Sequence, residues 1–188
     1  MIPPVPPKPS KAQLADAVHL TVPDLIAPDL DVLFCGINPG LYTAAIGHHF
    51  GRPGNRFWPA LFGAGFTPRL FKPWDEGELL ALGVGITNMV ERTTASAAEL
   101  APEEYVRGGA RLTMVVLAHT PKVVAFLGIG AYRHTFARPR ASLGVQAERI
   151  GASALWVLPS PSGLNANHQL PDLVALFAEL RDWVGRGR

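Results

Sequence analysis

Short apolar runs that alternate with longer, helix-like segments are the feature that most narrows the fold of this chain. The runs are rich in β-branched residues and lie at residues 31–37, 83–90, 122–128 and 153–159. The longer segments carry helix-start residues or apolar residues at helical spacing, and lie at residues 74–82, 101–120 and 170–184. Strands that alternate with helices pair in parallel and are covered on both faces. We therefore predict an α/β fold, a three-layer α/β/α sandwich with a mainly parallel central sheet of about four to five strands.

The chain has the size of one domain. Its 188 residues are 48% hydrophobic, which is enough for one well-packed core and short for two. We expect the proline-rich residues 1–10 to form a flexible tail and residues 11–188 to form a single domain. No apolar stretch approaches the ~20 residues of a membrane span, and the first residues do not resemble a signal peptide. We expect a monomeric, cytoplasmic protein that makes no membrane contact.

Charge permits a polyanionic partner without requiring one. The net charge is +2, and basic residues cluster at residues 48–56 and 133–140. A solvated arginine face explains such clusters equally well, so they decide nothing alone.

Several familiar site patterns are absent from the sequence. The glycines of residues 128–133 miss the dinucleotide pattern because Arg133 stands where its third glycine would be, and there is no phosphate-binding loop. The single cysteine, Cys35, lies inside a predicted strand, where it cannot form an intrachain disulfide. His48 and His49 are adjacent and lack the spacing of zinc ligands. We therefore expect no metal and no cofactor.

Three loops that leave predicted strands carry unusual residues. They are NPGLYTAAIGHHFGRPGNRFW (38–58), NMVERTT (88–94) and PSPSGLNANHQ (159–169). Open α/β sheets bind their ligands beyond the carboxyl ends of the strands, so we expect these loops to converge on one site.

Two of these loops begin with motifs that resemble those of a known enzyme family. GINPG (36–40) and PSPSGLN (159–165), with NRFW (55–58) and TNMVERTT (87–94) between them, resemble the mismatch-specific uracil and thymine DNA glycosylases. These form the MUG/TDG branch of the uracil-DNA glycosylase superfamily, and the likeness is to its bacterial MUG type. It covers most of residues 31–184 and implies a uracil-DNA glycosylase-like fold.

The resemblance implies a monofunctional DNA glycosylase that initiates base-excision repair. Its partner would be double-stranded DNA containing G:U or G:T mispairs, so that it would associate with the nucleoid when bound. It would flip uracil out of its mispair with guanine and hydrolyse the N-glycosidic bond with a positioned water; thymine and modified pyrimidines such as ethenocytosine are further candidate substrates. Neither motif contains a lysine, so no Schiff-base lyase step is expected.

The resemblance makes Asn38 the residue that positions the water. An amide orients a water by hydrogen bonding but cannot take its proton at neutral pH. The alternative is that Asn38 only bonds the backbone of its own turn, as asparagines before proline often do. The implied substrate-binding residues are Gly36, Ile37, Pro39, Gly40, Thr43, Phe50, Asn88 and Ser160. Among these, Phe50 would stack on the flipped base, with ordinary core packing as its alternative.

The second motif supplies the expected DNA wedge. Leu164 is an apolar side chain on a polar loop, and it would fill the space left by the flipped base, together with Ser162, Gly163 and Asn165. The alternative is that Leu164 folds back onto the core.

The sequence departs from its relatives at the head of the second motif. Leu158 stands where the fast uracil-DNA glycosylases have a histidine, and Ser160 stands where bacterial mismatch-specific relatives commonly have asparagine. Because Asn38 and Leu158 together leave the site without an ionisable catalyst, we consider two helper carboxylates. Glu91 follows a strand end and is preferred, with an ion pair to Arg92 or a neighbouring arginine as the alternative. Asp75 is the second candidate, although capping-box spacing with Glu78 gives it a structural explanation.

A rival function of another class is a non-catalytic α/β module that binds nucleic acid or senses a nucleotide. Such a module would keep the turn at residues 36–40 but would not hydrolyse the glycosidic bond. Base excision from a G:U duplex distinguishes the two.

Overall fold

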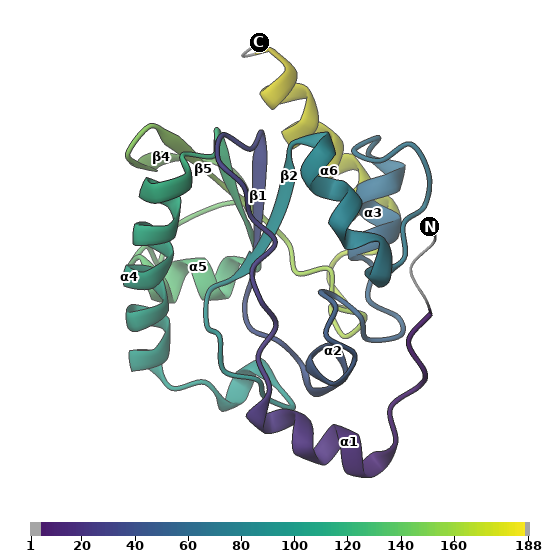
Figure 1. The fold of residues 1–188 in the computed structure, drawn as a ribbon. Coiled ribbons are helices and arrows are strands. Elements are labelled where there is room, and N and C mark those ends of the chain that lie inside the picture. The colour runs from purple at the N-terminus through teal and green to yellow at the C-terminus, as the bar shows by residue number, and fades with distance from the viewer. Residues whose placement is uncertain (1–4, 187–188) are drawn as a thin grey trace.

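The computed structural model describes residues 5–186 and has a five-stranded sheet at its centre (Figure 1). The strands are β1 (Val32–Gly36), β2 (Val84–Asn88), β3 (Val123–Leu127), β4 (Gly144–Ile150) and β5 (Ser153–Leu158). Their order across the sheet is β2-β1-β3-β5-β4. All neighbours pair in parallel except β4, which runs antiparallel to β5. The predicted, mainly parallel sheet is thus confirmed.

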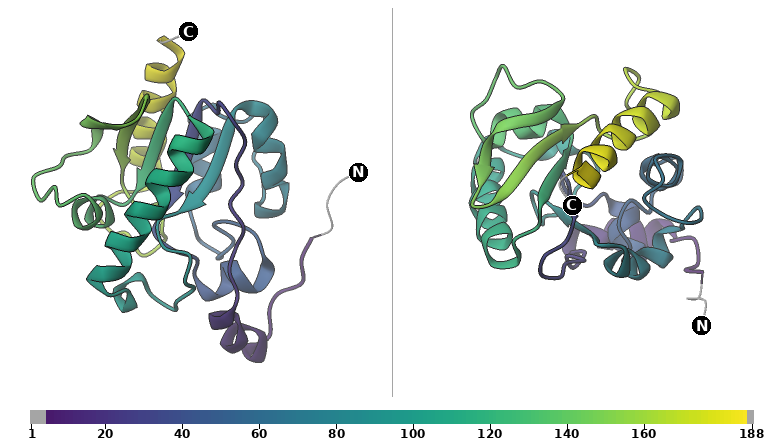
Figure 2. Two further views of the ribbon diagram at one scale, coloured as in Figure 1. Left: turned by 60° about the vertical axis from the view of Figure 1, so that its left-hand side comes forward. Right: turned by 90° about the horizontal axis from the view of Figure 1, so that it is seen from above.

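Helices cover both faces of this sheet. The α-helices are α1 (Lys11–Asp16), α2 (Leu41–Ile46), α3 (Phe57–Gly63), α4 (Pro102–His119), α5 (Ile129–Thr135) and α6 (Leu170–Arg186). Three 3-10 helices span Ala17–His19, Pro73–Leu82 and Ala97–Glu99. Figure 2 shows α4 and α6 on opposite faces of the sheet, as the three-layer prediction requires.

Alternate residues of the strands enter two separate cores. In β1, Phe34 joins the core with α3 and α6, whereas Leu33 and Cys35 join the core with α4 and α5. Strands buried on both faces are mostly apolar, which explains the apolar runs in the sequence, although the buried strand residues Thr87, Asn88 and Ser153 are polar.

Two segments differ from the prediction. Strand β4 has no apolar run, because its side chains alternate between half-buried and exposed as far as Arg149, with Gln146 and Glu148 among them. Residues 74–82 do form a helix, but of the tighter 3-10 type, with Asp75 N–H donating to the Lys72 carbonyl at 2.9 Å.

The predicted tail at residues 1–10 lies partly outside the described residues. From residue 5 to residue 9 the chain has no regular secondary structure, and Pro9 is buried. Ser10 then begins α1, because its hydroxyl accepts the Gln13 N–H at 3.2 Å.

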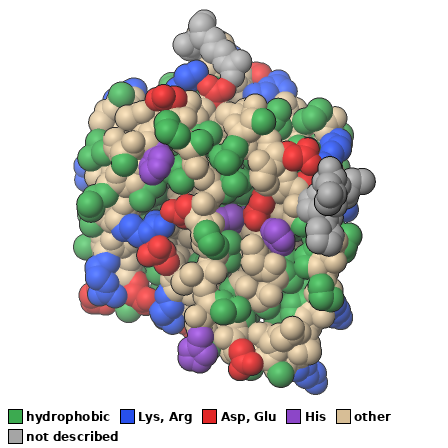
Figure 3. All heavy atoms as spheres, in the orientation of Figure 1, with side chains coloured by type: hydrophobic (Ala, Val, Ile, Leu, Met, Phe, Trp, Pro, Cys, Tyr) green, Lys and Arg blue, Asp and Glu red, His purple; other side chains and the backbone are tan. Residues whose placement is uncertain are grey.

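The exterior agrees with the modest net charge. On the face shown in Figure 3, Lys and Arg side chains lie beside Asp and Glu side chains. None of the helices between residues 5 and 186 is both long enough and apolar enough to cross a membrane.

Candidate active site

The three loops that were expected to converge do so around one cavity of about 410 Å³. It lies beyond the carboxyl ends of β1, β2 and β5, on the side of the sheet where Figure 1 shows α2. Twelve of the predicted site residues line it: Gly36, Ile37, Asn38, Pro39, Gly40, Thr43, Phe50, Asn88, Ser160, Ser162, Leu164 and Asn165. Cavities of about 570 and 590 Å³ lie near the opposite ends of the strands, where those motifs contribute nothing.

The side chain of Asn38 is held in one orientation. Its Nδ2 donates to the Arg92 carbonyl at 2.8 Å, to Thr94 Oγ1 at 2.7 Å and, weakly, to the Pro39 carbonyl at 3.3 Å. Thr94 Oγ1 accepts this bond because its own proton goes to the Ser96 carbonyl at 2.9 Å. Carbonyl acceptors can face only the amide N–H₂, so Oδ1 is turned the other way. No hydrogen bond from the described residues reaches Oδ1, which remains free to accept one from a water.

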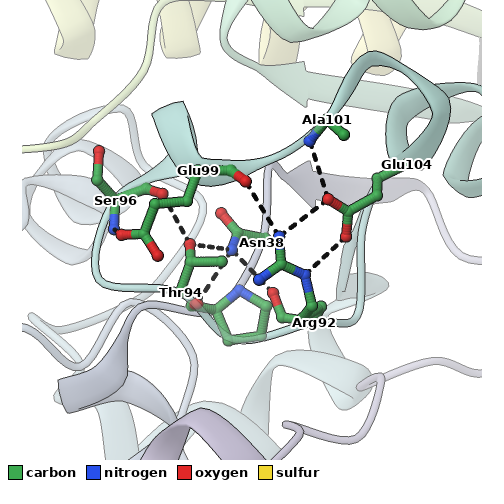
Figure 4. A network of polar contacts seen from close by, with 8 residues as sticks. Asn38, Arg92, Thr94, Ser96, Glu99, Ala101 and Glu104 are labelled. Atoms are coloured by element: carbon green, nitrogen blue, oxygen red, sulfur yellow. Dashed lines mark hydrogen bonds and ion pairs between the residues drawn. The ribbon is translucent and has the colours of Figure 1, made fainter.

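An ion pair fixes the loop that holds Asn38 (Figure 4). Arg92 Nε and Nη2 donate to the two carboxylate oxygens of Glu104 at 2.7 and 2.9 Å. Glu104 also accepts the Ala101 N–H at the start of α4. The hydrogen bonds from Arg92, followed by that backbone bond, lower the pKa of Glu104 to about 2. The orientation of Asn38 thus depends on the contact between Arg92, in the 88–94 loop, and Glu104 of α4.

An aromatic ring forms one wall of the cavity. Phe50 is half-buried and stacks on the core residue Phe57, with ring centroids 4.1 Å apart. Its backbone is left-handed, with φ 51°, a conformation that costs energy for a bulky residue. The Phe50 ring packs on the core and also lines the cavity, where stacking on a flipped base stays a prediction.

Gly36 allows the cavity wall to close. A Cβ at this position would lie 2.5 Å from Asn88 Oδ1 and 3.4 Å from the Phe50 ring. The side chain of Asn88 is almost fully buried, yet makes no hydrogen bond to a residue in the described range. An amide that lines the cavity and has no partner in the described protein is a candidate ligand contact.

His49 also lines the cavity, although it was not among the residues predicted for the site. Its Nε2 lies 3.0 Å from the Pro23 carbonyl and must therefore donate. Burial lowers the pKa of His49, although Glu76 and the Pro23 carbonyl act against this shift. The imidazole is thus neutral at neutral pH, with the proton on Nε2.

The loop of the second motif is internally bonded and projects its leucine outward. Leu164 N–H donates to Ser162 Oγ at 3.2 Å, and Asn165 Nδ2 donates to the Ser160 carbonyl at 2.9 Å. Gly163 belongs to this loop without lining the cavity. The Leu164 side chain is 76% exposed, so the alternative in which it folds onto the core does not apply.

Neither proposed helper carboxylate lies in the cavity. Glu91 is exposed and pairs with Arg111 of α4 at 3.1 Å, which is the neighbouring-arginine alternative. Asp75 is buried elsewhere, where it accepts from Arg69 at 2.9 Å and from the Lys72 N–H at 2.8 Å. Burial alone would raise the pKa of Asp75, but these bonds outweigh it and lower the pKa. The structure therefore gives no support to either residue as a base for the water.

The remaining lining residues were not selected from the sequence. They are His49, Arg52, Asn55, Thr94, Ala95, Ser96, Ala97, Leu127 and Pro161. Several lie within the quoted motifs, so their proximity to the site could be expected, but their contacts could not. No Asp or Glu from the described part of the chain lines the cavity, and no cluster of His, Cys, Asp and Glu there could hold a metal.

Comparison with known proteins agrees with this arrangement. The chain is similar to the solution NMR structure of a candidate uracil DNA glycosylase from Methanosarcina acetivorans, with a TM-score of 0.57. The two share 18% sequence identity, over 86% of this chain and 98% of that one, a likeness that establishes the fold. The profile of the Uracil DNA glycosylase superfamily matches residues 23–183. That match spans most of the domain, including every loop of the cavity, and the chain therefore belongs to the uracil DNA glycosylase superfamily.

Proposed function

We propose that this DNA glycosylase is monofunctional and removes uracil mispaired with guanine from duplex DNA by attack of a water held on Asn38. Membership of the superfamily supports glycosylase activity and DNA as the partner. The observation that carries the finer proposal is the fixed amide of Asn38, whose free Oδ1 belongs to a cavity without a carboxylate.

The chemistry follows from what an amide can do. Breaking the bond between C1′ and the base nitrogen leaves a sugar with oxocarbenium character, and the base departs with the bonding electron pair. A water bound to Asn38 Oδ1 then adds to C1′ and releases its proton to solvent, because a neutral amide does not take it. Such a site orients its water without activating it. It therefore requires a base that leaves well as an anion, which favours uracil.

The cavity offers matching contacts for a pyrimidine. The Phe50 ring provides a stacking surface, and the unpartnered Asn88 amide has both a donor and an acceptor for a ring edge carrying a carbonyl and an N–H. Leu158 is buried in the sheet, so no histidine stabilises the departing anion from that position. A slower enzyme than the histidine-containing relatives is expected.

Preference for mispairs would come from the cost of flipping. Extrusion of a base costs a few kcal/mol, and least where pairing is already weak. Leu164 is exposed at the mouth of the cavity, where it can fill the space that the base leaves. We propose thymine and modified pyrimidines such as ethenocytosine, opposite guanine, as further substrates.

The test is single-turnover excision from a duplex with one G:U mispair, read out by alkaline cleavage of abasic sites. Wild type should cut, and Asn38→Ala should bind the duplex normally but excise about 10²-fold more slowly or worse, because its water is no longer positioned. Gln146→Ala is a matched control, since this amide also donates to two carbonyls but lies on β4.

Two results would contradict the proposal. Tight binding without cleavage by wild type would favour the non-catalytic module. Excision by Asn38→Ala within a few-fold of wild type would remove the water-positioning role. A panel of uracil, thymine and ethenocytosine opposite guanine would then rank the substrates.

A further inference from the structure

The loop that carries Leu164 is attached to the core through one arginine. Arg56 Nη1 donates to the His168 carbonyl at 2.7 Å, and Nη2 donates to the Asn165 carbonyl at 2.9 Å and to the Ser162 carbonyl. The backbone N–H of Arg56 donates to the Pro161 carbonyl at 2.9 Å. One residue therefore bonds four points of residues 161–168, on both sides of Leu164.

Arg56 is itself fixed, because it precedes α3. The next two residues, Phe57 and Trp58, are buried in the core against α6 and the sheet. The 161–168 loop is thus connected by hydrogen bonds to a rigid element rather than to another surface loop.

A second contact joins the same two segments. A Cβ on Gly163 would lie 2.7 Å from the Gly54 carbonyl oxygen, so the two backbones touch directly beside Leu164. Only glycine fits at this position without a shift of backbone.

The chemistry of Arg56 is unusual for a residue that serves stability alone. Within the described residues it forms no ion pair, and its Nε is buried without a hydrogen-bond partner. Folding is less favourable when a guanidinium exchanges its hydrating water for uncharged carbonyl groups and leaves one of its N–H donors without a partner. The planar fork, however, is the side chain best able to hold several carbonyls at once.

We propose that Arg56 is a positioning residue that holds the 161–168 loop in the conformation in which Leu164 enters DNA. The proposal rests on the function above and adds its means of preorganisation. A loop already ordered in the free protein loses less entropy when it inserts, so the wedge offsets more of the unstacking cost.

The first experiment reads the loop without DNA. A nitroxide spin label is placed on Leu164→Cys, and the buried Cys35 leaves this position as the accessible thiol among the described residues. Adding Arg56→Gln should narrow the spectrum as the loop becomes mobile, and Arg56→Lys should be intermediate. Arg133→Gln is the matched control. Arg133 also holds a loop through a backbone carbonyl, because its Nε and Nη2 donate to the Ala141 carbonyl at 3.0 and 2.6 Å.

The second experiment compares single-turnover excision from two substrates. Arg56→Gln should slow excision from the G:U duplex by about 10- to 100-fold, the range expected for losing hydrogen bonds from a charged donor. Excision of unpaired uracil in a bubble, where unstacking costs less, should fall only a few-fold. In the Leu164→Ala background, Arg56→Gln should add little, because both changes remove the same interaction.

The outcomes separate the two proposals. An unchanged spectrum, equal losses on both substrates, or additive effects with Leu164→Ala would overturn the role of Arg56. If wild type excises neither substrate, the proposed function fails, and the spectrum alone then decides whether Arg56 holds the loop. A spectrum narrowed as much by Arg133→Gln would show a general loss of stability and would also overturn the role.

Discussion

Two amide side chains face the same cavity and are held in opposite ways. Asn38 gives its N–H₂ group to acceptors of the protein, so its orientation is set before any ligand arrives. Asn88 is buried without such a bond in the described structure, so its amide remains available to a ligand. Single residues of one type thus divide the proposed work, with Asn38 holding water and Asn88 contacting the base.

His49 provides a test by pH. Because burial keeps its pKa below that of an unfolded histidine, about 6.5, the unfolded chain binds more protons below that pH. The free energy of unfolding should therefore fall as the pH drops below 6.5, and His49 should contribute at most about 1.4 kcal/mol per pH unit to this loss. Above pH 6.5 His49 should not affect stability. Thermal unfolding between pH 5 and 8 should show a smaller acid loss in His49→Gln, whose amide can still donate to the Pro23 carbonyl. Parallel curves would contradict the assignment.

The two carboxylates outside the cavity should affect excision little. Glu91→Gln removes only an exposed ion pair to Arg111, so single-turnover excision should remain within a few-fold of wild type. Asp75→Asn should cost about 0.5–2 kcal/mol of stability, as loss of a helix-start contact does, with excision unchanged. A collapse of excision in either variant at normal stability would restore that residue as a helper base.

At the scale of elements, the sequence was most informative where strands are buried on both faces. Strands β1, β3 and β5 are apolar at nearly every position, and β2 is buried throughout although it contains Thr87 and Asn88. Strand β4 is only partly buried and carries polar residues, so it could not be recognised. The convergence of the loops followed from the rule for parallel sheets.

The position of Glu91 could not be predicted in the same way. After β2 the chain continues beside the first motif, with Met89 N–H bonded to the Gly36 carbonyl and Val90 N–H to the Ile37 carbonyl. Glu91 is thereby carried past the cavity to Arg111 of α4. Such a course depends on tertiary contacts that no local pattern records.

The Leu164 loop gives the first prediction about an element. Leu164→Ala should weaken excision from well-paired sites more than from mismatched or single-stranded ones, because the wedge offsets an unstacking cost that is smaller in disrupted DNA. Single-turnover rates on matched duplex, mismatched and single-stranded substrates measure this. Equal losses on all three would argue against the wedge.

The start of α4 gives the second prediction about an element. Glu104→Gln should weaken the hold on Arg92, whose carbonyl orients Asn38, and so slow excision while leaving DNA binding unchanged. Since the pKa of Glu104 is about 2, its carboxylate is charged in the folded protein throughout the range above pH 4, and its stabilising effect is lost progressively as pH falls from about 4.5 toward 2. Any acid limb of wild-type excision above pH 4 should therefore persist in this variant. Its disappearance would implicate Glu104 directly.

At the scale of the whole molecule, the modest net charge of +2 limits how much of DNA binding can be electrostatic. Arg52 is exposed at the cavity and forms no ion pair among residues 5–186, so it is the best-placed cation for a phosphate. Arg52→Ala should reduce the salt dependence of duplex binding by about one unit of slope, with similar loss on all sequences. Titrations at several salt concentrations measure it, and an unchanged slope would exclude the contact.

The order of strands across the sheet also has a consequence for how the enzyme folds. The cavity needs the loops that follow β1, β2 and β5. Strand β5 lies near the end of the chain and takes its place in the sheet by pairing with β3. Contacts between segments so distant in sequence form slowly. During synthesis, a growing chain that already contains Asn38 and Asn88 still lacks the complete cavity that would hold a base. Refolded enzyme should accordingly regain catalysis in its last kinetic phase, so that an incompletely folded chain removes no bases from DNA.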